Sequence, residues 1–191
     1  LGVEAGGGDR DVAVVQCYGT NEATKKIMEY SGIQTCSAAK QFFGGLSACP
    51  YGCIGLGDCE RVCEFDAIKV IDGVAQVDRE ACVACGMCAK ACPNSVIRIS
   101  TEKNKVVVQC RSIAAGAQVR KVCSNGCIGC KMCEKACKFD AVHVEDNLAF
   151  IDPEKCKNCG ACAKVCPTYA IVNMRKPPVK KTPAVKKSEK D

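Results

Sequence analysis

Three stretches of the chain share a cysteine spacing that suits an iron–sulfur cluster. Each reads C-x-x-C-x-x-C-x-x-x-C, at residues 82–92, 127–137 and 156–166, and proline follows the first and the last. One tight loop of this form can place three thiolates on three corners of a [4Fe–4S] cube. In two-cluster ferredoxins the fourth cysteine binds the neighbouring cluster. Gly86 and Gly160 allow the backbone to approach the cube closely. The spacing therefore predicts single-electron chemistry on paired [4Fe–4S] clusters.

Crossed ligation assigns most of the cysteines to four clusters. In the second half of the chain, one cluster takes Cys127, Cys130, Cys133 and Cys166, and another takes Cys137, Cys156, Cys159 and Cys162. In the first half, a third cluster takes Cys63, Cys82, Cys85 and Cys88. The fourth cluster is left with Cys53, Cys59 and Cys92, one thiolate short.

An alignment of the two halves shows why the fourth cluster is one ligand short. The stretch "GCIGLGDCERVC" (52–63) matches "GCIGCKMCEKAC" (126–137) without a gap, but Leu56 stands where the second copy has Cys130. Cys49 lies four residues before Cys53 and is the nearest unassigned thiol. We expect Cys49 to complete this cluster. The alternative is a site of three cysteines that holds a [3Fe–4S] cluster or none.

Four further cysteines lie outside these sets, namely Cys17, Cys36, Cys110 and Cys123. Buried free thiols are common and would explain them. However, four is the number that another cluster needs. Cys17 and Cys110 each end a "VVQC" segment, and Cys36 and Cys123 each begin a "C-S" pair. We therefore expect four [4Fe–4S] clusters, with a fifth as the favoured interpretation of the remaining thiols.

The composition agrees with a metal-stapled fold. The 191 residues include 20 cysteines, one histidine and no tryptophan, and aromatic residues make up 5%. A chain with so few large apolar side chains needs staples to stay folded. Disulfides are disfavoured because no signal peptide is visible, and structural zinc usually takes two C-x-x-C pairs across a loop. Thiolates held as cluster ligands indicate a reducing compartment, such as a cytoplasm in an oxygen-poor setting.

The net charge of +6 comes mainly from the C-terminus. Residues 175–191 hold seven Lys/Arg and two Asp/Glu, a net of +5, so the other residues are almost neutral. Clusters with four thiolates would make this body acidic, which argues against nucleic-acid binding. The composition of "RKPPVKKTPAVKKSEKD" is typical of a disordered basic tail. It is either a solvated extension or a contact for an anionic membrane surface.

A duplication organises the chain. Residues 49–97 and 123–171 align at a constant offset of 74, with 25 identities in 49 positions. Each copy predicts a cysteine loop, two short alternating strands, a second cysteine loop and a closing strand. The expected fold is α+β, with tandem two-cluster bacterial ferredoxin-like modules over 49–100 and 123–172, stabilised by their clusters. Segment 1–48 should add a short strand and a helix over 20–32, segment 101–122 should connect the modules, and 173–191 should be the tail.

Other features predict little chemistry. "GCIGLG" is not a dinucleotide fingerprint because no strand–helix unit surrounds it. His143 falls on an alternating strand and is expected to be exposed rather than a ligand. No flavin or nicotinamide site, acid–base set or nucleophile is recognisable. No apolar run is long enough to span a membrane. "EAGGGDRD" is typical of the end of a linker, so we expect the chain to be part of a longer protein.

The quoted motifs resemble a known family. "VVQC", "YGCIGLGDCERVCEFDAI" and "VCSNGCIGCKMCEKACKFDAV", with the two standard loops, resemble the B subunit of the Rnf complex, an ion-translocating ferredoxin:NAD oxidoreductase of bacteria. The resemblance covers about residues 1–172. The membrane helix and four-cysteine module with which the family's proteins begin are absent here.

The resemblance implies a role without a catalytic site of its own. The chain would accept electrons from reduced ferredoxin and pass them to the other components of a membrane complex that reduces NAD and exports Na⁺ or H⁺. It would lie in the cytoplasm, peripheral to the cytoplasmic face of the cell membrane. The alternative is a free soluble polyferredoxin that serves several reductases.

Overall fold

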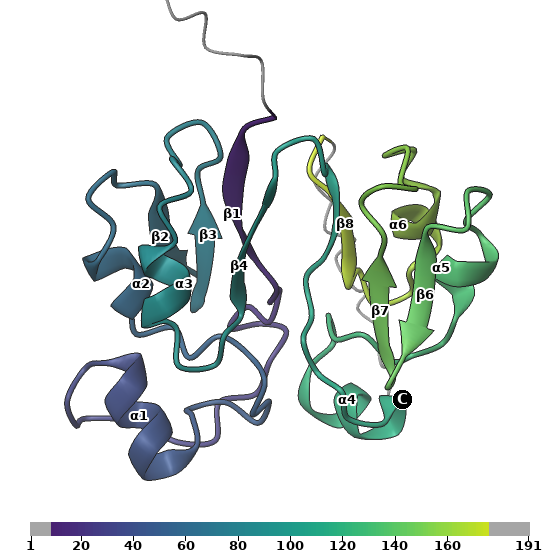
Figure 1. The fold of residues 1–191 in the computed structure, drawn as a ribbon. Helices are drawn as coiled ribbons and strands as arrows, with labels where there is room; N and C mark the ends of the chain where they lie inside the picture. Colours follow the sequence, from purple (N-terminus) through teal and green to yellow (C-terminus); the bar gives the residue numbers. More distant parts are fainter. Residues whose placement is uncertain (1–8, 176–191) are drawn as a thin grey trace, which may run out of the picture.

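The computed structural model describes residues 9–175, and in it two similar small modules lie side by side (Figure 1). In module one, strands β1 (Asp11–Val15) and β4 (Ile97–Thr101) pair antiparallel, as do β2 (Ile68–Ile71) and β3 (Val74–Val77). In module two, β5 (Val106–Val108) pairs with β8 (Ile171–Asn173), and β6 (Val142–Glu145) with β7 (Leu148–Ile151). The mixed α+β class expected from the sequence is confirmed.

One short helix follows each cysteine loop. These are α2 (Asp58–Arg61) and α3 (Met87–Ala91) in module one, and α5 (Met132–Lys135) and α6 (Ala161–Val165) in module two. Each starts after a residue in the left-handed conformation, which is glycine in three cases and Lys131 in the fourth. Glycine adopts that conformation without strain, so the loop can turn sharply around a ligand and enter the helix directly.

The "VVQC" segments complete the two modules. Val12 to Val15 are buried in β1, whose register pairs Val15 with Ile97 at the end of module one. The same relation holds in module two, where Val108 pairs with Ile171. Segments that come before each duplicated unit in the sequence are therefore part of its sheet. This arrangement delivers Cys17 and Cys110 to equivalent positions just beyond β1 and β5.

The helix predicted over residues 20–32 is wrong. That segment contains a turn and isolated bridges, in which Thr24 pairs with Cys123 and Lys26 pairs with Ser47. The backbone N–H of residue 25 also donates to the carbonyl of Val122 at 3.4 Å. Pairing with distant backbone has replaced the local helix, because propensity is a weak determinant against tertiary hydrogen bonds.

Two helices lie elsewhere than expected. Helix α1 (Cys36–Phe43) begins after Thr35, whose hydroxyl accepts a hydrogen bond from the Ala38 N–H, and ends at Gly44 with φ 71°. Helix α4 (Gly116–Val122) lies within the segment expected to be only a connecting strand or linker. The two helices lie below the two modules in Figure 1.

The cysteines form part of both hydrophobic cores. In module one, Cys59, Cys82 and Cys88 pack with valine and isoleucine side chains from the strands, and module two has an equivalent cluster. Within residues 9–175, none of the helices has the length and apolar character that a bilayer span requires. The basic tail predicted at the C-terminus lies outside the described residues from 176 onward.

Candidate iron–sulfur centres

The first cavity in module one is lined by four thiols that the sequence grouped together. We call Cys63, Cys82, Cys85 and Cys88 the outer set of module one. Cys85 is exposed, whereas Cys82 and Cys88 are buried. The Cys82 Sγ accepts hydrogen bonds from the N–H groups of Ala13 at 3.3 Å and Ala84 at 3.4 Å. Strand β1 therefore contributes directly to this site, a role that the sequence did not reveal.

The second cavity in module one contains a different fourth thiol from the one predicted. It is lined by Cys36, Cys53, Cys59 and Cys92, which we call the inner set of module one. Burial raises the pKa of the Cys59 thiol to about 12, with smaller contributions from the thiols of Cys53, Cys36 and Cys92. Cys36 therefore supplies the fourth thiol of this cavity, whose spacing lacks a cysteine at position 56.

Asp58 ties Cys36 to this cavity. Its Oδ1 accepts a hydrogen bond from the Cys36 N–H at 2.8 Å, and its Oδ2 accepts from the Ser37 N–H at 3.0 Å. Burial alone would raise the pKa of Asp58, but these hydrogen bonds together with Arg61 lower it. Negative charge at the start of α1 also suits the free N–H groups of a helix N-terminus. The position equivalent to Asp58 in module two is Met132, where no such tether is needed.

The expected grouping of Cys49 with Cys53, Cys59 and Cys92 is therefore corrected. Cys49 is close to these cysteines in the sequence, but its thiol lines another cavity. Cys36 is farther away along the chain and is returned to the site by α1. The aspartate at position 58, where the other copy has methionine, was the sequence signal that could have identified Cys36.

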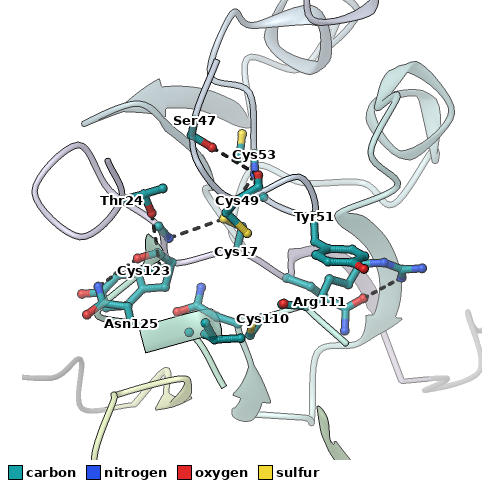
Figure 2. Close-up of a pocket in the computed structure, with 18 residues that line it drawn as sticks. Cys17, Thr24, Ser47, Cys49, Tyr51, Cys53, Cys110, Arg111, Cys123 and Asn125 are labelled. Carbon is teal, nitrogen blue, oxygen red and sulfur yellow. Dashed lines mark hydrogen bonds between the residues drawn. The ribbon is translucent and has the colours of Figure 1, made fainter. Parts of the chain in front are cut away.

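The third cavity lies between the two modules. Its lining includes Cys17, Cys49, Cys110 and Cys123, which we call the interdomain set, and Cys53 of the inner set also borders it (Figure 2). Burial raises the pKa of the Cys17 thiol to about 12 and also raises that of Cys110 and Cys49. The Thr24 hydroxyl donates to the Cys123 Sγ at 3.3 Å. Of the cysteines predicted for a fifth cluster, three are here, and Cys49 has exchanged places with Cys36.

The interdomain set lies against both inner sets in the same way. The Cys17 Sγ accepts a hydrogen bond from the Cys53 N–H at 3.3 Å, and the Cys110 thiol accepts one from the Cys127 N–H. Cys53 and Cys127 are equivalent residues of the two copies. The backbone of the cysteine loop in each module thus connects the interdomain set with the inner set of that module.

Module two brings together both sets that its spacing predicts. Burial raises the pKa of Cys133 to about 12, with smaller contributions from Cys127, Cys166 and Cys130, which complete its inner set. Burial also raises the pKa of Cys162 to about 11, with smaller contributions from Cys156, Cys137 and Cys159, which complete its outer set. Backbone N–H groups again point at sulfur, since Asn158 donates to Cys156 and Ala141 donates to Cys137, both at 3.4 Å.

The donor sets fit [4Fe–4S] clusters. All 20 cysteines are free thiols, and they divide into five sets of four. Thiolates are ligands for thiophilic metals, and the spacing of these cysteines is the one typical of [4Fe–4S] clusters. Within residues 9–175, no three Cys, His, Asp or Glu side chains converge closely enough for a single ion. The thiols of module one and the interface instead surround cavities.

Comparison with protein families agrees with this chemistry. A family described as "4Fe-4S binding domain" matches residues 75–98 and 149–172, and a second family with the same description matches residues 124–140. The chain is therefore an iron–sulfur protein built from ferredoxin-type modules. These matches leave out eight cysteines, whose grouping rests on the sequence and the structure: Cys17, Cys36, Cys49, Cys53, Cys59, Cys63, Cys110 and Cys123.

The chain is also similar over most of its length to components of ion-translocating redox complexes. It is 45% identical over 172 residues to the B subunit of the Na⁺-translocating ferredoxin:NAD⁺ oxidoreductase complex of Acetobacterium woodii, a match that covers 90% of this chain and 52% of the relative. It is 41% identical to the B subunit of the ion-translocating oxidoreductase complex of Methanosarcina acetivorans, covering 90% and 65% of the two chains. The B subunit of the proton-translocating ferredoxin:NAD⁺ oxidoreductase complex of Clostridium ljungdahlii is 43% identical, covering 84% and 57%.

These matches confirm the resemblance to the B subunit of the Rnf-type complexes. The chain spans between about half and two thirds of the length of these relatives.

The role of Asp58 can be tested in the folded holoprotein. Changing Asp58→Asn removes the charge that holds the Cys36 and Ser37 N–H groups, hydrogen bonds that are worth about 1 kcal/mol or more. We expect the iron bound by the inner set of module one to be lost several-fold faster to a chelator. Asp66→Asn is a suitable control, because the Asp66 side chain is 81% exposed and, among residues 9–175, forms an ion pair only with Lys69. Equal rates for both variants would contradict a tethering role.

Proposed function

We propose that this chain is an electron-transfer subunit that relays single electrons through five [4Fe–4S] clusters. Its electrons come from reduced ferredoxin and pass to other subunits of a complex that reduces NAD and exports Na⁺ or H⁺. The chain lies peripherally on the cytoplasmic face of the membrane that holds this complex. The names of the three relatives support the partner and the reaction.

The interdomain set is the observation that carries the proposal. Two ferredoxin-like modules joined only by a linker would be independent carriers. Here, the four cysteines of the interdomain set come from both modules and line one cavity between them, which Cys53 also borders. A cluster at this position joins the pair of clusters in module one to the pair in module two. The series then runs from the outer and inner sets of one module, through the interdomain set, to the inner and outer sets of the other.

Different groups of residues have different roles in the proposed relay. The clusters, when bound, supply reversible one-electron chemistry. The thiols hold them, the strands and small helices exclude water, and N–H and O–H donors stabilise the negative charge on sulfur, which is one determinant of cluster potential. The Asn125 side chain donates to the Tyr18 carbonyl at 2.9 Å and Arg111 donates to the Gln16 side chain at 3.3 Å, and these bonds fix the modules together.

A free polyferredoxin is the second candidate and is less well supported. The more extensive matches are to components of ion-translocating complexes, over 84–90% of this chain. Both proposals predict clusters, but only the first predicts stable association with other subunits.

The relay is tested by removing the interdomain cluster alone. Cys110→Ser should lower bound iron by about four per chain and leave the clusters of both modules in place. Electrons introduced by reduced ferredoxin should then reach one module only, as counted by reduced-state EPR within the first turnover. Ser112→Ala is the control, because Ser112 is buried beside the same cavity but carries no thiol. Full reduction of both modules at the normal rate in Cys110→Ser would overturn the proposal.

A further inference from the structure

The two ends of the proposed series have different surfaces. The outer set of module one and the outer set of module two occupy equivalent positions of the duplicated unit, with the exposed Cys85 and Cys159 as equivalent ligands. Residues that follow the ligands differ in chemistry. Lys138 directly follows Cys137, and Lys157 directly follows Cys156. The corresponding residues in module one are Glu64 and Val83.

The lysines at the module-two end are available to a partner. Both Lys138 and Lys157 are exposed, and neither makes an ion pair within residues 9–175. Lys155, which replaces Ala81 of module one, has its Nζ 3.0 Å from the Asp140 carboxylate and adds to the positive surface only in part. The exposed Cys159 lies between these lysines and Lys164 in the sequence. Along the sequence, lysines therefore flank a ligand that solvent can reach, with the exposed Glu154 as an acidic neighbour.

The module-one end exposes more apolar side chains, although Glu64 is also exposed there. Val83, Met87 and Phe65 line the cavity of its outer set, and their exposed fractions are 53%, 47% and 45%. Surfaces with exposed apolar side chains favour lasting contacts between proteins, because the gain comes from burying area. Unpaired charges instead favour rapid, salt-sensitive encounters, because they steer a partner of opposite charge before contact.

We propose that Lys138 and Lys157 form the docking site for an acidic one-electron carrier protein, which delivers its electron to the outer set of module two. This inference rests on the proposed relay and names the point at which electrons enter it. The carrier has the chemistry of a ferredoxin, since cluster thiolates and carboxylates make such small proteins anionic. The electron then passes through the inner set of module two and the interdomain set toward module one.

The test uses the full chain with its clusters and a two-cluster ferredoxin of low isoelectric point. The second-order rate of electron transfer is measured by stopped flow across a range of salt concentrations. For the unchanged chain, the rate should fall steeply as salt rises. The double variant Lys138→Glu, Lys157→Glu should be slower by roughly 10-fold or more at low salt, and its rate should no longer fall with salt. The control Lys25→Glu, Lys90→Glu changes the net charge equally but lies outside this end, and its rate should stay near normal.

Further measurements distinguish failure of the docking site from failure of the relay. Reduction by titanium(III) citrate should be complete in all variants, and failure there would argue against the relay itself rather than against the place where electrons enter. Equal losses of rate in the two double variants would overturn the docking site, because net charge alone would then explain them. The site would also be overturned if the Lys138, Lys157 variant lost binding to anionic lipid vesicles while its rate with ferredoxin was unchanged.

Discussion

Changing Cys36→Ala should remove the cluster held by the inner set of module one, and adding Leu56→Cys should restore it. Cys36 lines the cavity of Cys53, Cys59 and Cys92, and nothing else in that cavity carries a thiol. The single variant should lose about four irons, or about one if a [3Fe–4S] cluster remains. The double variant regains the spacing of module two, where Cys130 occupies the position of Leu56. Iron analysis and EPR measure both.

The matched comparison is with Cys49. Cys49→Ala should also lose a cluster, but Leu56→Cys should not restore it, because Cys49 lies in the interdomain cavity. Leu56→Cys alone should leave the iron content unchanged. Restoration of Cys49→Ala by Leu56→Cys, together with an intact cluster in Cys36→Ala, would show that the grouping first expected from the sequence was right.

Removing iron should unfold the chain. The eleven buried core residues of module two include four cysteines, Cys110, Cys127, Cys133 and Cys162, and the strands around them are three to four residues long. Such short sheets are marginal without additional staples. A chelator under reducing conditions should therefore abolish the cooperative thermal transition followed by far-UV circular dichroism. A native-like spectrum and a cooperative transition after complete iron loss would contradict this account.

The duplicated part of the fold was predictable because spacing fixes local geometry. A constant offset of 74 and intact loops were enough to identify the outer sets and the inner set of module two, and alternation identified the two hairpins. The parts that were not predictable depend on contacts between distant segments. Thr24 pairs with Cys123 in place of a local helix, and Asp58 accepts a hydrogen bond from the N–H of Cys36, which begins a separate helix. Sequence proximity favoured Cys49, whereas the path of the chain through α1 favours Cys36.

Long-range pairing also explains why the role of the "VVQC" segments was only partly visible. Their repetition suggested related strands, but no local pattern fixes the register of strands so far apart in the chain. The structure pairs Val15 with Ile97, and this pairing carries Cys17 to the interface. A short strand at the edge of one module therefore supplies a thiol to the cavity shared by both.

Iron and acid-labile sulfide per chain, measured with reduced-state EPR on the same anaerobic sample, test the central claim most directly. Five sets of four thiols predict about 20 iron and about 20 sulfide per chain, with interacting signals from reduced [4Fe–4S] clusters. About 16 of each, with four free thiols titratable after unfolding, would contradict an interdomain cluster and leave two separate pairs. Stoichiometric zinc in place of iron and sulfide would contradict the account as a whole.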